Sequence, residues 1–480
     1  MFKLRYIIWG LIAVFLTSCN TTKSTNNNTN ITSKLPSAYS LNSDTIKIEI
    51  LNWKKLFFDA KLTQLIDTAL VKNFDLNIAL QKIEISRTNL NFSKSFLLPE
   101  VTIGAGASLR KFGNYTMDGV GNFDTNLSQN ITPQQQIPNP LPDYGFGFQT
   151  SWEADVWGKL KNRKKAALAR FTASNYGKNY IITNLVAEIA SVYFQLLALD
   201  TELNILRENI VLQQEALDVV KIKKEVGKAN SLAVELLGAQ IFNSKAIKTE
   251  VAQQIIETQS KLTFLCGKYP DVIERDTSFT NQNFDNFIII GIPSQLINNR
   301  PDIKQAEFEL IASNANILAA KAAFYPSFNI NANVGLQAFN TQFLLQAPAS
   351  IAYGLLGNFS APLLNRRKIK ADLLAANAEQ KLAYINYEKL IFNSFTEVYN
   401  AINSVKNTKE IYSLKKQEVE LLKRAISTSS ELFNVGKAGY LEVFLSQQTA
   451  LKSQIELLNH KKQQNIAVVN LYKALGGGWQ

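Results

Sequence analysis

The residue types that most often carry catalysis or bind metals are rare in this sequence. Its 480 residues include two cysteines, Cys19 and Cys266, and one histidine, His460. A structural zinc site uses four Cys or His ligands, and a cysteine nucleophile needs a histidine beside it, so the sequence indicates neither site. It also contains no phosphate-binding glycine motif. We therefore expect no enzyme activity; Cys266 should be a small buried residue at an apolar helix end, and His460 a solvated helix residue.

Cys19 is the one side chain whose context indicates chemistry, and that chemistry is acylation. Two basic residues near the start are followed by an apolar run over 6–16, and the run ends in Leu16-Thr17-Ser18-Cys19. This is the pattern of an export signal, and it is too short to span a membrane. Its end resembles the bacterial lipobox, in which the cysteine is lipidated and becomes the first mature residue. We expect 1–18 to be a lipoprotein signal peptide and 19–35 to be the acylated cysteine with a polar tether.

The composition allows a large core and gives little support for nucleic-acid binding. Apolar residues make up 46% of the chain, and 51 Lys or Arg against 39 Asp or Glu leave a formal charge of +12. The basic residues are scattered through helical segments, whereas nucleic-acid sites gather them in one patch, often with aromatic residues. We expect no nucleic-acid partner.

Two segments that follow prolines alternate strictly between apolar and small or polar residues. One runs over 101–109 after Pro99 and the other over 328–336 after Pro326, and each is followed by a second alternating segment, over 144–152 and 351–359. Period two with different chemistry on the two faces is typical of a strand between two solvents. A half-buried soluble sheet has the same alternation, but strands of about ten residues with aromatic residues near their ends favour a transmembrane barrel.

Four strands are too few to enclose a barrel, because bacterial single-chain barrels begin at about eight. An open sheet edge in lipid would leave backbone groups without hydrogen-bond partners. If the strands lie in a membrane, other copies of the chain must supply the rest of the barrel, and closure then requires a symmetric ring.

Each strand pair is followed by a long helical segment. Between 161 and 226 there is no proline, and Leu185, Val192, Leu199 and Leu206 recur every seven residues, with a second apolar register four residues behind. This is a coiled-coil pattern, and ~65 helical residues span about 100 Å. A matching apolar register in the second half runs from Val398 to Phe433.

Both long segments end in the same turn sequence, and a returning helix follows each. Glycine can adopt the left-handed conformation that stops a helix, so each turn marks a helix end. The two turns consist of Val226, Gly227, Lys228, and of Val435, Gly436, Lys437.

The order of these elements predicts an internal two-fold repeat. We expect a first half over 36–267, with a strand hairpin at about 100–153 and a turn at 227, and a second half over 301–480, with a hairpin at about 327–361 and a turn at 436. A linker over 268–300 joins them. The loop between the first two strands is long and proline-rich, and such a loop is expected on the outer face of a membrane hairpin.

Several of these segments resemble one known family. Residues 291–326 contain Arg300-Pro301-Asp302-Ile303 and end in Ala322-Ala323-Phe324-Tyr325-Pro326, and the stretch after Trp53 matches the family's opening. With the paired Val-Gly turns, they resemble the outer-membrane efflux proteins, the TolC-like outer-membrane factors of the lipoprotein branch. The resemblance spans about residues 36–478.

The resemblance implies an α+β membrane protein that forms a homotrimer. Each protomer would give four strands to a 12-stranded β-barrel, which would continue into a long periplasmic α-helical coiled-coil barrel. The trimer would be a passive exit duct in the bacterial outer membrane, anchored there through lipid on Cys19, with no other cofactor. Its partners would be a periplasmic adapter, or membrane-fusion protein, and an inner-membrane pump. Neither a cargo nor a gate residue is indicated.

The resemblance also implies that the two turns are tips that contact the adapter, although the same residues would serve equally as simple helix caps. Relatives often place an aspartate six residues after the glycine, where this chain has Ala233 and Glu442. A specific contact by that acid is therefore in doubt in the first half.

Two other classes of protein fit parts of the sequence. A lipid-anchored periplasmic coiled-coil spacer or adhesin would share the signal and the heptads but have no pore. A hydrolase site within 268–300 would use the acids there, but they lie in loop-like sequence with no regular spacing.

Overall fold

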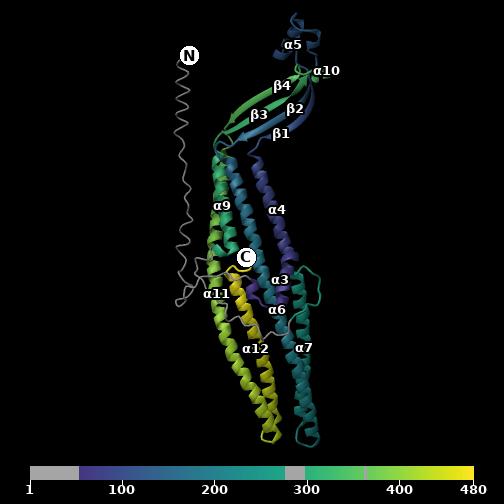
Figure 1. Ribbon diagram of the computed structural model, residues 1–480, viewed down its shortest axis with the longest axis vertical. Coiled ribbons are helices and arrows are strands. Elements are labelled where there is room, and N and C mark those ends of the chain that lie inside the picture. The colour runs from purple at the N-terminus through teal and green to yellow at the C-terminus, as the bar shows by residue number, and fades with distance from the viewer. Residues whose placement is uncertain (1–52, 276–297, 362–363, 365, 480) are drawn as a thin grey trace.

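We describe the protein from a computed structural model, which defines residues 53–275, 298–361, 364 and 366–479. The described part of the chain is elongated, with a small curved sheet at one end and long helices that run to two turns at the other end (Figure 1). The expected signal peptide over 1–18, Cys19 with the tether over 19–35, and residues 276–297 of the expected linker lie outside the described residues.

The sheet has four antiparallel strands in the order β1-β2-β3-β4, so the pairing of β2 with β3 joins the two halves of the chain. In a single chain, β1 and β4 are the two edges. The strands are β1 (Glu100–Arg110), β2 (Leu141–Ala154), β3 (Ser327–Ala338) and β4 (Ile351–Ser360).

The strand register places different chemistry on the two faces of the sheet. Ile103, Phe148, Val334 and Tyr353 pair in one row across all four strands. The next row, on the opposite face, consists of Thr102, Gln149, Asn333 and Gly354. The alternation read from the sequence therefore becomes one apolar face and one face of small and carboxamide side chains.

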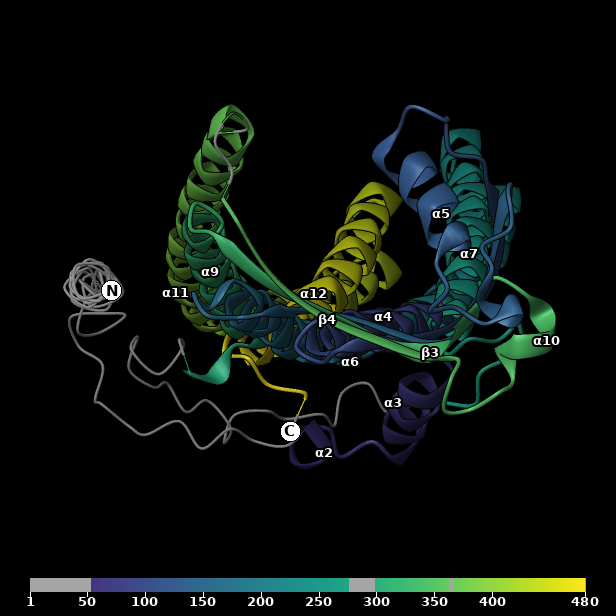
Figure 2. The ribbon, with the colours of Figure 1, turned by 90° about the horizontal axis from the view of Figure 1, so that it is seen from above.

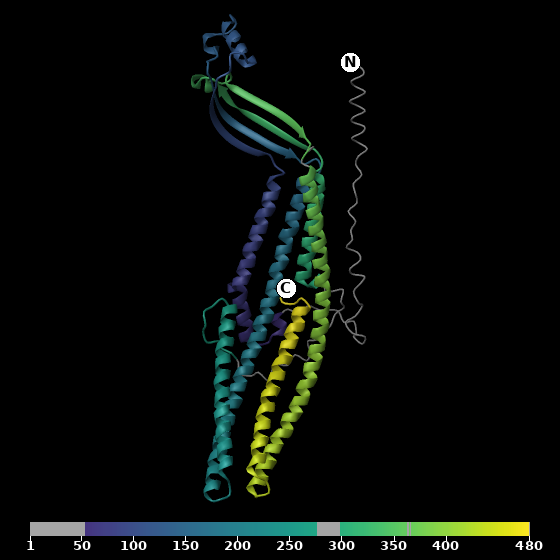
Figure 3. The same cartoon turned by 180° about the vertical axis from the view of Figure 1, so that it is seen from behind.

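The middle of the sheet requires glycine at one close backbone approach. A Cβ at Gly147 would lie 2.5 Å from the Cα of Gly335, its partner on β3, so no larger residue fits without a shift of the backbone. Glycines at such positions allow strands to bend strongly, as the curved sheet in Figure 3 does.

The helices run away from the sheet as antiparallel pairs (Figures 1 and 3). Two of them, α6 with 67 residues and α11 with 69, each span about 100 Å at 1.5 Å per residue. The helices of the first half are α2 (Trp53–Leu56), α3 (Ala60–Lys72), α4 (Phe74–Ser95), α6 (Lys159–Glu225) and α7 (Ser231–Leu265). Those of the second half are α9 (Pro301–Ala322), α11 (Arg366–Asn434) and α12 (Tyr440–Ala474).

The main apolar core lies around the middle of α6. The heptad residues Leu185, Val192, Leu199 and Leu206 are all buried, and so are the adjacent aromatic residues Tyr193 and Phe194. One segment of α6 is long and apolar enough to cross a membrane by composition alone, but 67% of that window is buried inside the protein. The apolarity of α6 therefore reflects its place at the centre of the helix bundle.

The loop between β1 and β2 contains a helix that the sequence pattern did not predict. This helix, α5 (Met117–Leu127), begins where the Thr116 side chain accepts a hydrogen bond from the Gly119 amide. The Asn126 side chain exchanges two hydrogen bonds with the backbone of Ile137, at 2.9 and 2.7 Å. A short turn, η3 (Pro133–Gln135), follows. The prolines of this loop come after α5, so they do not interrupt it. A four-residue helix, α10 (Thr341–Leu344), lies in the loop between β3 and β4.

Candidate conduit: the barrel sheet and the helical tips

Both predicted turns lie at the end of the molecule farthest from the sheet (Figures 1 and 3). The first connects α6 to α7 and the second connects α11 to α12. Gly227 has a φ of +70° and Gly436 a φ of +76°, in the left-handed region that other residues avoid. No atom lies within 4 Å of a Cβ built on either glycine, so only the backbone conformation selects glycine there.

The two turns have the same hydrogen bonds. The Lys228 amide donates to the Lys223 carbonyl at 2.7 Å, and the Lys437 amide donates to the Leu432 carbonyl at 2.8 Å. This is the Schellman arrangement that satisfies the last carbonyls of a helix. All six predicted tip residues are exposed, Val226 by 63% and Val435 by 68%. An apolar side chain therefore projects into solvent at the same point of each turn.

Just above the tips, the two helical hairpins touch each other. The Lys223 ammonium on α6 lies 3.7 Å from the ring centre of Phe433 on α11 and 3.5 Å from the side-chain oxygen of Asn434. Phe433 in turn packs against Tyr440 at the start of α12. Phe433 lies in the apolar register predicted from the sequence. Lys223 and Tyr440 were not predicted, because their contacts between the two hairpins join residues about 200 positions apart and leave no periodic signal.

Tyr440 belongs to a small apolar cluster that joins the hairpins. It packs with Phe444 of α12 against Leu217 of α6 and Leu237 and Ile241 of α7. Its hydroxyl is buried and has no hydrogen-bond partner among the described residues, and burial raises the pKa of Tyr440 to about 12. The Tyr440 side chain therefore contributes to the contact between the hairpins through the packing of its ring.

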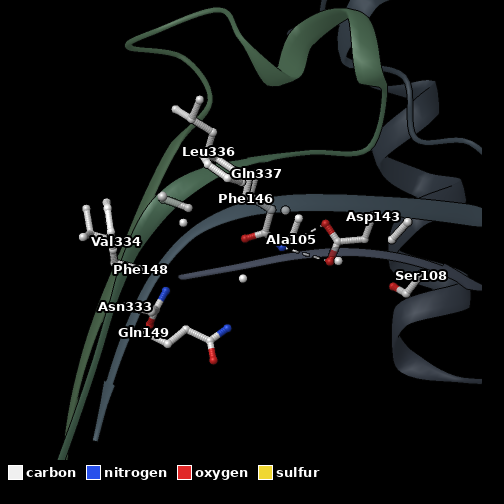
Figure 4. Close-up of a pocket in the computed structure, with 17 residues that line it drawn as sticks. Ala105, Ser108, Asp143, Phe146, Phe148, Gln149, Asn333, Val334, Leu336 and Gln337 are labelled. Carbon is white, nitrogen blue, oxygen red and sulfur yellow. Dashed lines mark hydrogen bonds between the residues drawn. The ribbon is translucent and has the colours of Figure 1, made fainter. Parts of the chain in front are cut away.

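The face of the sheet that carries the glycines and the carboxamides is hollowed. A cavity of about 390 Å³ lies over Gly104, Gly147 and Gly335, and Gln149 and Asn333 stand at its side (Figure 4). The side-chain nitrogen of Gln337 donates to both carboxylate oxygens of Asp143, at 2.9 Å each. Carboxamides and bare backbone are well suited to contact with water, whereas the opposite face presents apolar side chains.

The Arg300-Pro301-Asp302-Ile303 motif builds a buried charged cluster midway along the molecule. The Arg300 guanidinium donates to both oxygens of Asp302, at 3.0 and 2.7 Å, and to Glu397 of α11 at 2.6 Å. It also donates to the Ala474 carbonyl at the end of α12, at 3.1 Å. Burial alone would lower the pKa of Arg300. The hydrogen bonds and negative charges of Asp302 and Glu397 outweigh this effect, so the pKa of Arg300 is raised above its ordinary value. One side chain therefore ties together the start of α9, the middle of α11 and the end of α12.

The remaining candidates for chemistry form no reactive centre. Cys266 is buried, as expected, and burial raises the pKa of its thiol. His460 is half-buried on α12, not solvated as predicted, and its Nδ1 has no hydrogen-bond partner among the described residues. Within the described ranges, no group of three His, Cys, Asp or Glu is placed to hold a metal ion.

Comparison with known proteins identifies the family. The sequence matches the family described as outer membrane efflux protein over residues 65–268 and 292–477, which is most of the chain. It is 25% identical to the cation efflux system protein CusC of Escherichia coli O6:H1, over 89% of this chain and 88% of that protein. It is 26% identical to the solvent efflux pump outer membrane protein SrpC of Pseudomonas putida, over 89% and 87% of the two chains.

Solved structures share the fold. A crystal structure of CusC has a TM-score of 0.80 at 24% identity and covers 92% of this chain and 97% of its own. The open state of the Neisseria gonorrhoeae MtrE outer membrane channel has a TM-score of 0.80 at 23% identity, with 93% and 95% covered. The fold is therefore that of the TolC-like outer-membrane channels, and the chain belongs to the outer membrane efflux protein family, as an efflux channel of the outer membrane.

Proposed function

We propose that three copies of this chain form a passive exit duct across the outer membrane. Twelve strands, four from each copy, would close a barrel with lipid outside and water inside, and the long helices would continue the duct into the periplasm. The observation that carries this proposal is the sheet itself, which has one apolar face, one hollowed face of glycine and carboxamide groups, and two unpaired edges.

The edges supply the physical argument for a ring. In lipid, every backbone amide and carbonyl of β1 and β4 needs a partner, because water is absent there. When the β4 edge of each copy pairs with the β1 edge of the next, no edge is left unpaired only if the copies close around an axis. The family resemblance supports three copies, and three copies bring the strand count into the range of natural barrels.

Exposed apolar side chains along the helices also favour packing against other copies of the chain. Phe242 on α7 is 73% exposed, Leu421 on α11 is 59% exposed and Phe392 on α11 is 56% exposed. In a ring, such side chains would be covered where neighbouring copies pack against the long helices.

We further propose that the duct works with a periplasmic adapter and an inner-membrane pump, which would supply the energy. The tip residues Val226, Gly227, Lys228, Val435, Gly436 and Lys437 would contact the adapter. The exposed position of both turns at one end supports this role.

Cys19 would carry the lipid anchor. The chain would be an internal duplication, with halves over 36–267 and 301–480 joined by 268–300.

The names of two relatives refer to cations and to solvents, so proteins of similar sequence serve chemically different exports.

The first test is single-channel conductance of the purified, full-length protein in a planar bilayer, with the oligomer mass measured in parallel. We expect a trimer that gives small, mostly closed current steps with some cation preference. A monomer that conducts nothing would overturn the proposal and leave the coiled-coil spacer or adhesin as the better interpretation.

A further inference from the structure

The loop between β1 and β2 presents an apolar helix face that the chain itself does not cover. On α5, Met117, Val120, Phe123 and Leu127 fall on one side, and their exposed fractions are 92%, 55%, 69% and 69%. Beside them lies a cavity of about 480 Å³, whose wall includes Val120, Phe123, Ile137 and Leu141. Exposing this surface to water is unfavourable for an isolated loop, which indicates that another structure covers it.

The position of α5 limits what that structure can be. The helix lies beyond the upper end of the sheet in both side views (Figures 1 and 3). Seen from above, it lies on the inner side of the curve formed by the sheet and the long helices (Figure 2). It is thus outside the stretch where membrane lipid would contact the strands, and it is placed over the space that the sheet curves around.

The charges of the loop argue against a lipid headgroup as the covering group. Over 111–140 the loop has one basic residue, Lys111 next to the end of β1, and its other two charged residues are Asp118 and Asp124. Phosphate groups are bound through Arg, Lys and backbone amides, and two acids per copy would repel them. The same low charge allows copies of the loop to approach one another with little repulsion.

The dimensions fit a second copy of the same loop. Twelve strands about 4.8 Å apart, tilted by about 40°, close a barrel with a radius of roughly 12 Å. A helix of 11 residues is about 16 Å long and about 10 Å wide. A helix that leans inward from each of three walls therefore reaches the axis.

We propose that the apolar faces of three α5 helices pack against one another over the outer mouth of the barrel and form a cap. This inference rests on the proposed trimeric duct and adds a closure at its outer end. Side chains such as Met117 and Leu127 of one copy would enter the recess beside α5 of the next. The duct would then be restricted at its extracellular end.

Cross-linking in the outer membrane tests the contact. Single cysteines would be placed at Met117 and Leu127 on the apolar face, and at Thr125, an exposed residue on the opposite face of α5, as the matched control. Cys266 is 1% exposed, so the parent protein provides a low background. With a short bis-maleimide, we expect Met117→Cys and Leu127→Cys to give at least fivefold more linked dimer than Thr125→Cys.

The oligomer mass of each variant separates the two hypotheses. Equal linking of Leu127→Cys and Thr125→Cys, or no linking of any variant in a protein that is a trimer, would overturn the cap and leave the duct intact. A monomeric mass would overturn both.

A second measurement tests closure of the mouth. Residues 115–131 would be replaced by a short Gly-Ser linker in a chain that carries Asn333→Cys as a reporter on the hollowed face of the sheet. We expect a bulky polyethylene-glycol maleimide, added outside whole cells, to label the reporter at least tenfold faster without α5. A small maleimide should label both chains alike, and equal labelling rates with the bulky reagent would contradict the cap.

Discussion

At the scale of single residues, Arg300 has the clearest structural role. Its side chain is 6% exposed and is matched by Asp302, which is also buried, and by Glu397, whose side chain is 55% exposed. The motif was visible in the sequence because it is local. The partners on α11 and α12 were not, because Glu397 and Ala474 lie about 100 and 170 residues further along the chain. Sequence patterns indicate local periodicity only. Contacts between distant segments form in the tertiary structure, so they cannot be read from such patterns.

We expect Arg300→Met to destabilise the protein by about 3–5 kcal/mol, because Asp302 would remain buried without its counter-charge. Glu397→Gln is the matched control. In this variant Arg300 keeps its ion pair with Asp302, and the interaction that is lost is screened by solvent because Glu397 is exposed. The free energy of unfolding should therefore fall by less than about 1 kcal/mol. Urea unfolding of both variants measures the difference. A similar loss for both would mean that the buried pair is not the stabilising unit.

At the scale of elements, strands and long helices were the predictable part of this fold. Two-residue alternation located all four strands, and heptads located α6 and α11, because both signals repeat over many residues. The glycine turns were found because one residue type satisfies their backbone. The helix α5 was missed because the prolines and polar residues around it are typical of loops, and its helical start depends on one hydrogen bond from Gly119 to Thr116.

The glycine contact in the sheet gives a sharp comparison between two glycines of β2. Both strands next to β2 belong to the same chain, and a Cβ at Gly145 would meet only the Leu336 carbonyl oxygen, at 3.9 Å. We expect Gly147→Ala to reduce assembled protein in the outer membrane severalfold, since its Cβ would collide with the Gly335 backbone. Gly145→Ala should assemble normally. Semi-native electrophoresis of outer membranes measures the amount of assembled protein for both variants. Normal assembly of Gly147→Ala would show that β2 and β3 can move apart at this position.

The tips allow a prediction about the proposed adapter contact. Space around Gly227 and Gly436 is open, so a substitution there strains the turn by about 1–2 kcal/mol but displaces no neighbour. We expect the double variant Gly227→Glu, Gly436→Glu to keep its oligomer mass and lose at least tenfold in export. Ala229→Glu with Ala438→Glu, one step past the lysines, controls for added charge within the same turns. Export at the parent rate in the glycine variant would contradict the tip assignment.

At the scale of the whole molecule, the decisive property is the solvent on each face of the sheet. Family membership and fold follow from sequence similarity that extends over most of the chain, whereas the proposed ring and its water-filled lumen rest on the argument that the edges of the sheet must be paired. Two neighbouring residues on β3 distinguish a membrane duct from a soluble spacer. Val334 lies in the apolar row, and Asn333 lies in the carboxamide row one position away. In a duct these two side chains meet lipid and water, respectively.

We expect Val334→Lys to cost about 2–4 kcal/mol near the membrane midplane and to reduce trimer in the outer membrane sharply. Asn333→Lys should assemble at the parent level, because its ammonium would extend into water, and it should shift the reversal potential of the channel toward anions. Trimer yield and reversal potential in a salt gradient measure the two effects. In a soluble spacer neither face meets lipid, so a lysine at Val334 would be tolerated about as well as one at Asn333. Equal assembly of the two variants would therefore contradict the barrel and, with it, the duct.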